Sequence, residues 1–458
     1  MRRRIAGTIA FLLIPLLIAS DSGLATTGPV PLTERQKAQH VLNRLAFGPR
    51  PGDVEELLRT GIDRWIERQL HPEAIEDQEM EAMLARFETL EMSESELFDR
   101  YERPVIEARR SLQARAAGED SELDRDAMRR EIRERIGPDR DPRQPIFELT
   151  GSRILRAVHS ERQLEEVLVD FWMNHFNVFA GKGPSRALMT SYERDVIRPH
   201  IWGTFEDLLL ATAQSPAMLF YLDNARSVAE MENRPPVGQK VSDRSARSSR
   251  GRFSRSGRRA PKPERLEALE TAGLNENYAR ELMELHTLGV DGGYTQKDVT
   301  ELARLLTGWS LRRPEEGGEG GFVFRAALHD ARPKSVMGVG FSAGGGLEEG
   351  ERMIGLLARH PSTASHLARK LCQRLIGDDP PPALVERIAK VYGSSGGNLR
   401  ATVEAIVTGP EFFDPVWFRA KVKTPFEYVV SAVRATGADV DLRMLAMQLR
   451  EMGQPLYL

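Results

Sequence analysis

Apolar residues recur at helical spacing along most of this chain, in short runs that glycine and proline interrupt. Thr33 precedes the first run, which ends in the glycine- and proline-rich stretch 48–52, and Asp53 precedes the second. A third run ends at His71 and Pro72. Threonine and aspartate side chains accept hydrogen bonds from the free N–H groups at a helix start, whereas glycine and proline end helices. This punctuation predicts a packed assembly of short helices.

Strand signals are confined to one region, residues 321–324 and 336–341, which are short apolar runs beside glycines. Together these two segments predict a small hairpin. The predicted fold class is therefore mainly α: a multi-helix globular domain over residues 33–458, with at most a small β-hairpin and long inserted loops. Hydrophobic residues make up 41% of the 458 residues, which is enough for a substantial core.

The N-terminus has the three parts of a secretory signal peptide. Arginines at positions 2 to 4 precede an apolar run over 5–18, and small residues follow as far as Ala25. We expect residues 1–25 to be removed on export, with an uncleaved anchor as the alternative. The mature chain is then periplasmic or extracellular. No other run is long enough to span a bilayer, so no stable membrane span is expected after cleavage.

Two segments depart from the helical core pattern. Residues 76–143 are dense in Glu and Arg, whose i, i+4 spacing favours a solvated helix. We expect a charged helical arm there, with partial disorder as the alternative. Residues 234–263 mix Arg, Ser, Gly and Pro and carry too few apolar side chains to offset the entropy of ordering. They are expected to form a disordered Arg/Ser-rich insertion within the domain.

Charge and cysteine content exclude several classes of partner and site. Residues 237–263 hold nine Lys or Arg and one acid, Asp243, so they carry about +8; subtracting this from −3 leaves about −11 on the rest. Phosphate binding needs a basic face, so no nucleic acid partner is expected. The single cysteine, Cys372, forms no intramolecular disulfide and no cysteine-based metal site. Its apolar neighbours predict a buried thiol.

The first motif with polar residues in an apolar helix lies at 164–178. Four side chains at helical spacing form one apolar stripe: Leu164, Leu168, Phe171 and His175. Three others follow an adjoining face: Asp170, Asn174 and Asn177. His175 is either a core histidine satisfied by a hydrogen bond or a group of a functional site.

The second motif lies at 275–289. At 100° per residue, Asn277, Glu281 and Glu284 fall within about 60° of one another, with Arg280 beside them. The apolar face is predicted from three residues: Tyr278, Leu282 and Leu285. Two carboxylates this close raise the pKa of one of them, which suits acid/base work. Neutralisation of the carboxylates by Arg280 in a structural network explains the pattern equally well.

His286 lies at the far edge of that apolar face, which argues against a metal site built by this helix alone. In the next helix, Thr295 and Asp298 have the spacing of a capping box, which gives Asp298 a structural role. The buried side of that helix is predicted to contain four residues: Val299, Leu302, Leu306 and Trp309.

The third motif is His329–Asp330, followed by Lys334, in a loop. This combination suits proton transfer or anion binding, although adjacent side chains need not face each other. A metal site would need four side chains to converge through the tertiary fold: His175, Glu281, Glu284 and His329. Their spacing assigns no metal and no cofactor, and the common hydrolase and nucleotide-binding signatures are absent.

Several of these segments carry a family resemblance. The matching motifs lie at 171–176, 215–218, 221–224, 275–286, 293–296, 306–309 and 329–330. On these residues the chain resembles the bacterial DUF1800 family, exported proteins of unknown function. The resemblance implies partnership with a protein of the DUF1501 family. It also implies a further segment, rich in Pro, Gly and Trp, after the motif at 452–455, so this chain is expected to be a truncated member.

Two functions are compatible with these patterns, and whether the chain is an enzyme stays open. One is an exported hydrolase acting on a cell-envelope or extracellular polymer. Its catalytic residues would be Glu281, Glu284, Arg280 and His175, and its substrate-binding residues Asn277, His329 and Asp330. The other is a non-catalytic partner or scaffold for a co-exported protein, in which these residues form a buried hydrogen-bond and ion-pair network.

Overall fold

The computed structural model of the chain describes residues 30–116, 125–137, 141–234, 273–312 and 321–458. The expected signal peptide at 1–25, and all of the expected insertion at 234–263 except its first residue, lie outside the described residues. Within the described ranges, no helix is both long enough and apolar enough to cross a membrane.

The fold is mainly helical, as predicted, with two small antiparallel sheets. The helices of the first half are α1 (Glu34–Arg44), α2 (Asp53–Thr60), α3 (Ile62–Leu70), α4 (Gln78–Leu84), α5 (Glu94–Leu97), α6 (Arg103–Ala116), α7 (Arg125–Ile136), α8 (Gln144–His159), α9 (Gln163–His175), α10 (Ser185–Ser191), α11 (Phe205–Ala213) and α12 (Pro216–Tyr221). Those of the second half are α14 (Asn277–Glu281), α15 (Gln296–Leu305), α16 (Leu347–Ala358), α17 (Pro361–Leu375), α18 (Pro382–Ser394), α19 (Leu399–Val407), α20 (Pro425–Thr436) and α21 (Leu442–Glu451).

The first two helix starts predicted from capping residues have different outcomes. Thr33 caps α1 in a capping box with Gln36, as its position predicted. The prediction that Asp53 caps α2 is wrong by one residue, because Gly52 occupies the N-cap with a φ of 90°. Asp53 instead begins the helix and accepts a hydrogen bond from the backbone N–H of Arg50 at 2.7 Å.

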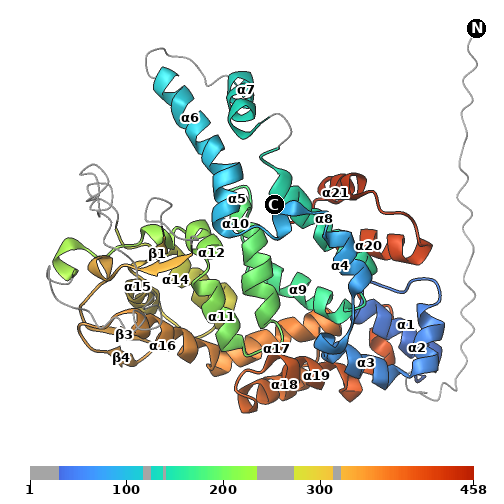
Figure 1. Ribbon diagram of the computed structural model, residues 1–458. Coiled ribbons are helices and arrows are strands. Elements are labelled where there is room, and N and C mark those ends of the chain that lie inside the picture. Colours follow the sequence, from blue (N-terminus) through green and yellow to red (C-terminus); the bar gives the residue numbers. More distant parts are fainter. Residues whose placement is uncertain (1–29, 117–124, 138–140, 235–272, 313–320) are drawn as a thin grey trace, which may run out of the picture.

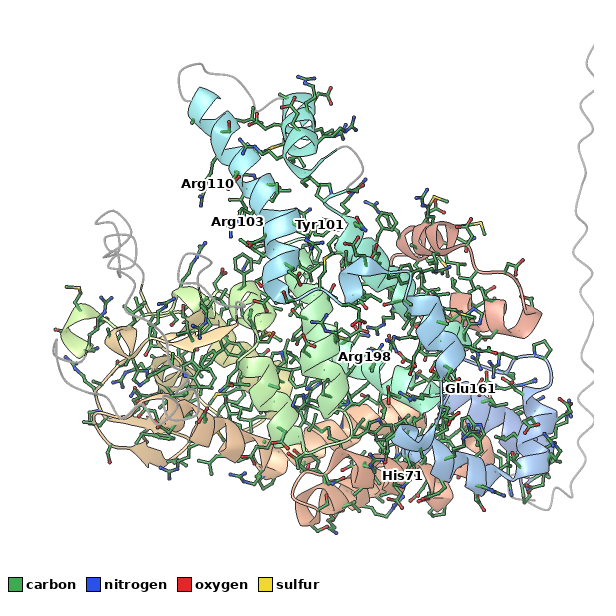
Figure 2. The ribbon with its side chains drawn as sticks, viewed as in Figure 1. His71, Tyr101, Arg103, Arg110, Glu161 and Arg198 are labelled. Carbon is green, nitrogen blue, oxygen red and sulfur yellow. The ribbon has the colours of Figure 1, made fainter. Side chains whose placement is uncertain are left out.

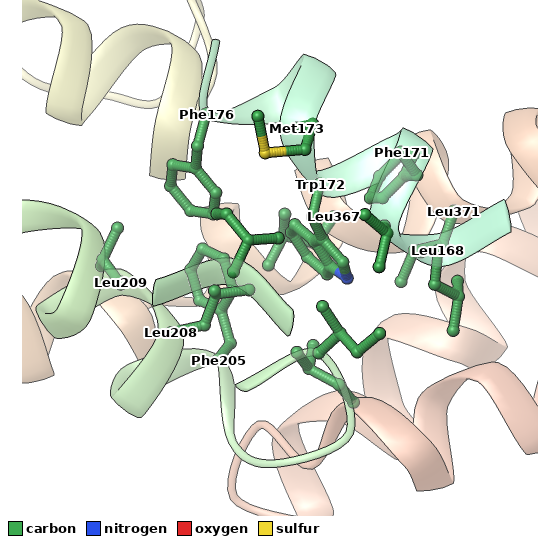
Figure 3. Close-up of a cluster of buried hydrophobic side chains, with 14 of the residues drawn as sticks. Leu168, Phe171, Trp172, Met173, Phe176, Phe205, Leu208, Leu209, Leu367 and Leu371 are labelled. Atoms are coloured by element: carbon green, nitrogen blue, oxygen red, sulfur yellow. The ribbon is translucent and has the colours of Figure 1, made fainter. Parts of the chain in front are cut away.

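The core is built around α9, whose predicted apolar stripe is buried along its whole length. Trp172 is 1% exposed, and Phe176 and Phe205 pack beside its ring, with centroids 5.9 and 5.8 Å away. Leu367 and Leu371 of α17 close the same cluster (Figure 3). Burial of each large side chain contributes roughly 1.5–3 kcal/mol, so this cluster holds the two halves of the chain together.

The charged segment 76–143 contains α4 to α7. Helices α6 and α7 pack against each other and stand out from the body (Figure 1). Ion pairs such as Arg103–Asp99 and Arg135–Glu131 run along this pair at i, i+4 spacing.

The predicted strand pairing is wrong. Strand β2 (Phe322–Phe324) pairs with β1 (Trp309–Leu311), and β3 (Lys334–Val336) pairs with β4 (Val339–Phe341). Strands β3 and β4 are neighbours in sequence, whereas β1, the partner of β2, follows the buried end of α15. Periodicity alone does not determine which strands pair. Trp309, predicted on the buried side of the helix, begins a strand that three residues separate from α15, while its side chain is fully buried, as predicted.

Candidate functional site

The helix that carries the second motif changes its hydrogen-bonding pattern halfway along. After α14 it continues as the π-helical turn η9 (Leu282–Thr287), in which Leu288 N–H donates to the carbonyl of Met283 at 2.8 Å. A π turn takes an extra residue, so side chains after it are rotated relative to an α-helix. Leu285, predicted to be on the apolar face, is instead 48% exposed, and His286 is buried.

Four polar residues of α14 and η9 lie on a partly exposed surface rather than in the interior: Asn277, Arg280, Glu281 and Glu284. Asn277 is exposed, and Arg280 donates to Gln296 at 2.8 Å while lying 3.6 Å from Glu276. Glu284 accepts a hydrogen bond from the hydroxyl of Tyr294 at 3.4 Å.

The two carboxylates of this surface are electrostatically coupled. Partial burial and then the charge of Glu284 raise the pKa of Glu281, and Arg280 only partly opposes the shift. This is the direction that the i, i+3 spacing predicted.

His175 lies inside the core with both ring nitrogens occupied. Nε2 is 3.0 Å from the carbonyl oxygen of His286, and Nδ1 is 2.9 Å from Nζ of Lys370. A carbonyl only accepts and an ammonium only donates, so Nε2 carries the hydrogen and the ring is neutral. Burial, the charge of Lys370 and then the neighbouring His286 ring hold the pKa of His175 well below its ordinary value.

These contacts separate the expected catalytic residues into two environments. His175 is a buried bridge between α9, η9 and α17, whereas Glu281 and Glu284 face solvent. Within the described ranges, no contact joins the histidine to either carboxylate, and no three side chains of the metal-binding types gather as a metal site.

The third motif is also buried, and its two adjacent residues, His329 and Asp330, bind different partners. His329 Nε2 lies 2.7 Å from Oε1 of Glu349, which also pairs with Lys334. Asp330 accepts two hydrogen bonds from Arg304, at 2.9 and 3.0 Å. The arrangement ties the β3–β4 region to α15 and α16.

A chain of buried ion pairs runs through the centre of the molecule, and sequence analysis missed it. Arg198, in the body of the fold (Figure 2), places its guanidinium 2.9 Å from both carboxylate oxygens of Glu166 and 2.7 Å from Glu193. Arg153 lies 2.7 Å from Asp170 and 3.5 Å from Glu193. Fork-shaped guanidinium contacts of this kind are the strong form of ion pair.

The network extends to the last helices of the chain. Arg374 of α17 lies 3.8 Å from Asp170 and 2.7 Å from Glu427 of α20. The Tyr457 hydroxyl donates to Glu193. Burial raises the pKa of Glu193, but the charges of Arg198 and Arg153 lower it by more, so that the pKa falls to about 2.

Only Asp170 of this network stood out in the sequence, as part of the polar edge of α9. No local pattern distinguishes the other members in the sequence. In most pairs of the network the two residues are at least 32 positions apart, as Arg198 and Glu166 are. The remainder of that polar edge, Asn174 and Asn177, lines a cavity of about 170 Å³ with residues 453–458.

Comparison with known proteins identifies a protein family for this chain. A family model described as "Protein of unknown function (DUF1800)" matches residues 40–458. No curated protein and no solved structure matches the chain. The matched region includes nearly all of the described helices and all three polar motifs, so the chain belongs to the DUF1800 family.

Proposed function

We propose that this chain is an exported, non-catalytic scaffold that binds a partner protein, and that most of its motif residues serve the fold. The observation that carries this proposal is the internal bonding of the motif side chains. The side chains of His175, His329 and Asp330 are buried, and each has a hydrogen-bond or ion-pair partner within the protein. A buried histidine whose lone pair already accepts from an ammonium group is a poor proton acceptor for a substrate.

A surface for a partner is available on α20 and α21. The exposed apolar side chains of this region are Tyr428 on α20, Met444 and Met447 on α21, and Met452 directly after α21. Tyr428 and Met452 also line a groove of about 380 Å³ between the two helices. Methionine-rich exposed surfaces adapt to protein partners, and contiguous apolar surface is uncommon on proteins that act alone.

The partner we propose is an exported protein of the DUF1501 family, as the family resemblance implies. Titration calorimetry with the purified chain and a purified DUF1501-family protein tests this. We expect a complex that Met447→Glu weakens at least about tenfold, because a charge is placed in an apolar contact. Val290→Glu changes another exposed apolar residue, 69% exposed against 55% for Met447, outside α20 and α21 and is the control. Absence of a complex, or equal effects of both variants, contradicts the proposal.

A second candidate function rests on the Glu281–Glu284 pair. Both carboxylates are half-buried at the surface, partial burial and the charge of Glu284 raise the pKa of Glu281, and the hydroxyl of Tyr294 donates to Glu284. An exported hydrolase acting on a cell-envelope or extracellular polymer would use them as acid and base.

The test is a screen of polymer hydrolysis with the wild-type chain, followed by Glu281→Gln and Glu284→Gln. Loss of about a hundredfold or more in kcat for both, with melting temperature retained, supports catalysis. Glu348→Gln, an exposed carboxylate of α16, is the control. Full activity in both glutamine variants rejects this function and leaves the scaffold proposal unaffected.

A further inference from the structure

A cationic cavity lies between the start of the chain and its last quarter. The cavity has a volume of about 340 Å³ and is lined by α1, the turn after it and the loop before α20. Four of its lining side chains are cations: Arg44, Arg419, Lys421 and Lys423. None of the polar motifs contributes to it.

The cations of this cavity lack acidic partners. Its one carboxylate, Glu427, is already paired with Arg374 at 2.7 Å. Across the described ranges, none of the four lining cations has a carboxylate within 4.0 Å. Lys421 donates only to main-chain carbonyls at the end of α17, at 2.9 and 3.3 Å. With four cations and one carboxylate, the cavity lining carries a net positive charge.

Two buried nitrogens of the cavity wall are also without hydrogen-bond partners in the described part of the chain. They are Nε of Arg44, a residue 6% exposed, and Nε2 of His40, a residue 2% exposed. An unsatisfied buried donor costs about 1–3 kcal/mol, and more when the group is charged. The guanidinium of Arg44 otherwise donates to the carbonyl of Trp417 at 3.0 Å.

The neighbouring charges repel one another. Burial, and then the charges of Arg374 and Arg44, lower the pKa of Lys421 to about 8 against the pull of Glu427. Burial and Arg44 lower the pKa of His40 to about 4. A bound negative charge would relieve both effects.

The backbone around the cavity is shaped for these cations. Gly48 has a φ of 101°, and a Cβ there would meet the Ser431 hydroxyl at 2.8 Å and Nζ of Lys423 at 3.4 Å. The absent side chain leaves room for the lysine to reach the cavity.

Part of the remaining wall is apolar and includes Phe47 and Phe418, whereas Gln39 and Asn43 make another part of it polar. We propose that the cavity binds a small organic anion, whose phosphate or carboxylate group lies between Arg44, Lys421 and Lys423 and whose organic part packs on this apolar wall. Guanidinium and ammonium groups are the donors that such oxyanions take in proteins.

Titration calorimetry of the full chain at 0.15 M NaCl tests the proposal with inorganic phosphate, phenyl phosphate, benzoate and neutral benzyl alcohol. We expect phenyl phosphate or benzoate to bind, the tighter of the two identifying the anionic group. Inorganic phosphate is expected to bind more weakly, since it lacks the apolar contact. Benzyl alcohol is expected not to bind, because it lacks the charge.

Two variants locate the site. Lys423→Met keeps the aliphatic stem but removes the charge, and Arg419→Ala removes an exposed cation of the rim. We expect the first to weaken binding about tenfold or more and the second about threefold, as loss of an inner and an outer charge should. Arg443→Ala removes an exposed cation outside the cavity and is the control.

Three outcomes overturn the proposal: no binding of any anion, binding of the neutral alcohol as tight as that of the anions, or equal losses in Lys423→Met and Arg443→Ala. Because Lys423 contacts Ser431, a melting curve of each variant accompanies the titration. If Lys423→Met does not fold, the affinity of the folded Arg419→Ala variant is compared with that of Arg443→Ala instead. Equal losses in these two variants then overturn the proposal.

Discussion

Arg198 shows at the scale of a single residue why composition is a poor guide to function in this chain. It is one of 64 Lys and Arg residues, yet it joins two buried carboxylates, Glu166 and Glu193. A buried charge whose partner is removed keeps its desolvation cost and loses its compensation. The network therefore explains polar residues in a helical core without requiring catalysis.

Truncation of this residue tests that role. We expect Arg198→Ala to lower the free energy of unfolding by about 3–5 kcal/mol, because two carboxylates lose their shared partner. Urea denaturation measures the change. Arg359→Ala, which breaks the exposed pair with Glu206, is the control and is expected to cost at most about 1 kcal/mol. Similar losses in both variants would show that burial gives Arg198 no special role.

At the scale of elements, contacts between helices override local helix preference. Gly350 lies inside α16, where alanine is intrinsically favoured. A Cβ at this position would lie 2.7 Å from the ring of the fully buried Trp309. Here the glycine allows α16 to approach Trp309 at the start of β1.

A pair of glycine substitutions separates packing from helix preference. Gly350→Ala is expected to destabilise the fold by about 1–3 kcal/mol, because overpacking outweighs the gain in helix preference. Gly393→Ala, in α18 with nothing within 4 Å of the new Cβ, is expected to stabilise it by up to about 1 kcal/mol. Melting temperatures of the two variants measure this, and shifts of the same sign would contradict the packing argument.

The π turn η9 is another effect at this scale. A uniform α-helix predicts Leu285 inside, but the extra residue of the turn exposes it and buries His286. The buried carbonyl of His286 then meets His175. A sequence pattern does not show where a helix forms a π turn, because contacts with other helices stabilise that turn.

The whole molecule buries several histidines in neutral form. Burial is the first cause in each case: the pKa of His40 falls to about 4, that of His286 to about 3, and that of His175 well below its ordinary value. The unfolded chain binds protons at these residues near pH 6.5, whereas the folded chain does not. The contribution of these neutral histidines to the free energy of unfolding is therefore fully present above pH 6.5. It is lost as the pH falls from 6.5 toward 4.

Urea denaturation at pH 7, 6 and 5 measures this loss. With three such groups, the free energy of unfolding should fall by up to about 4 kcal/mol per pH unit below pH 6. His286→Gln removes one titration and is expected to reduce that slope by about one third. A flat profile between pH 7 and 5 would mean that these histidines can take up protons in the folded chain.

The sequence by itself determined the helical class, the capping boxes of Thr33 and Thr295, and the buried faces of α9 and α15. It also determined that Cys372 is buried, where burial raises the pKa of the thiol to about 12. These features are local, because periodicity and capping depend on residues three to seven positions apart.

Tertiary structure alone decided which strands pair, where the second motif widens into a π turn, and which charges meet. Glu166 and Arg198 are 32 positions apart, and Arg44 reaches Trp417 across 373. Contacts at such separations depend on the arrangement of all the helices between them, which no local pattern encodes. The ion-pair network and the cationic cavity are for this reason properties of the fold, and of their residues only Asp170 stood out in the sequence.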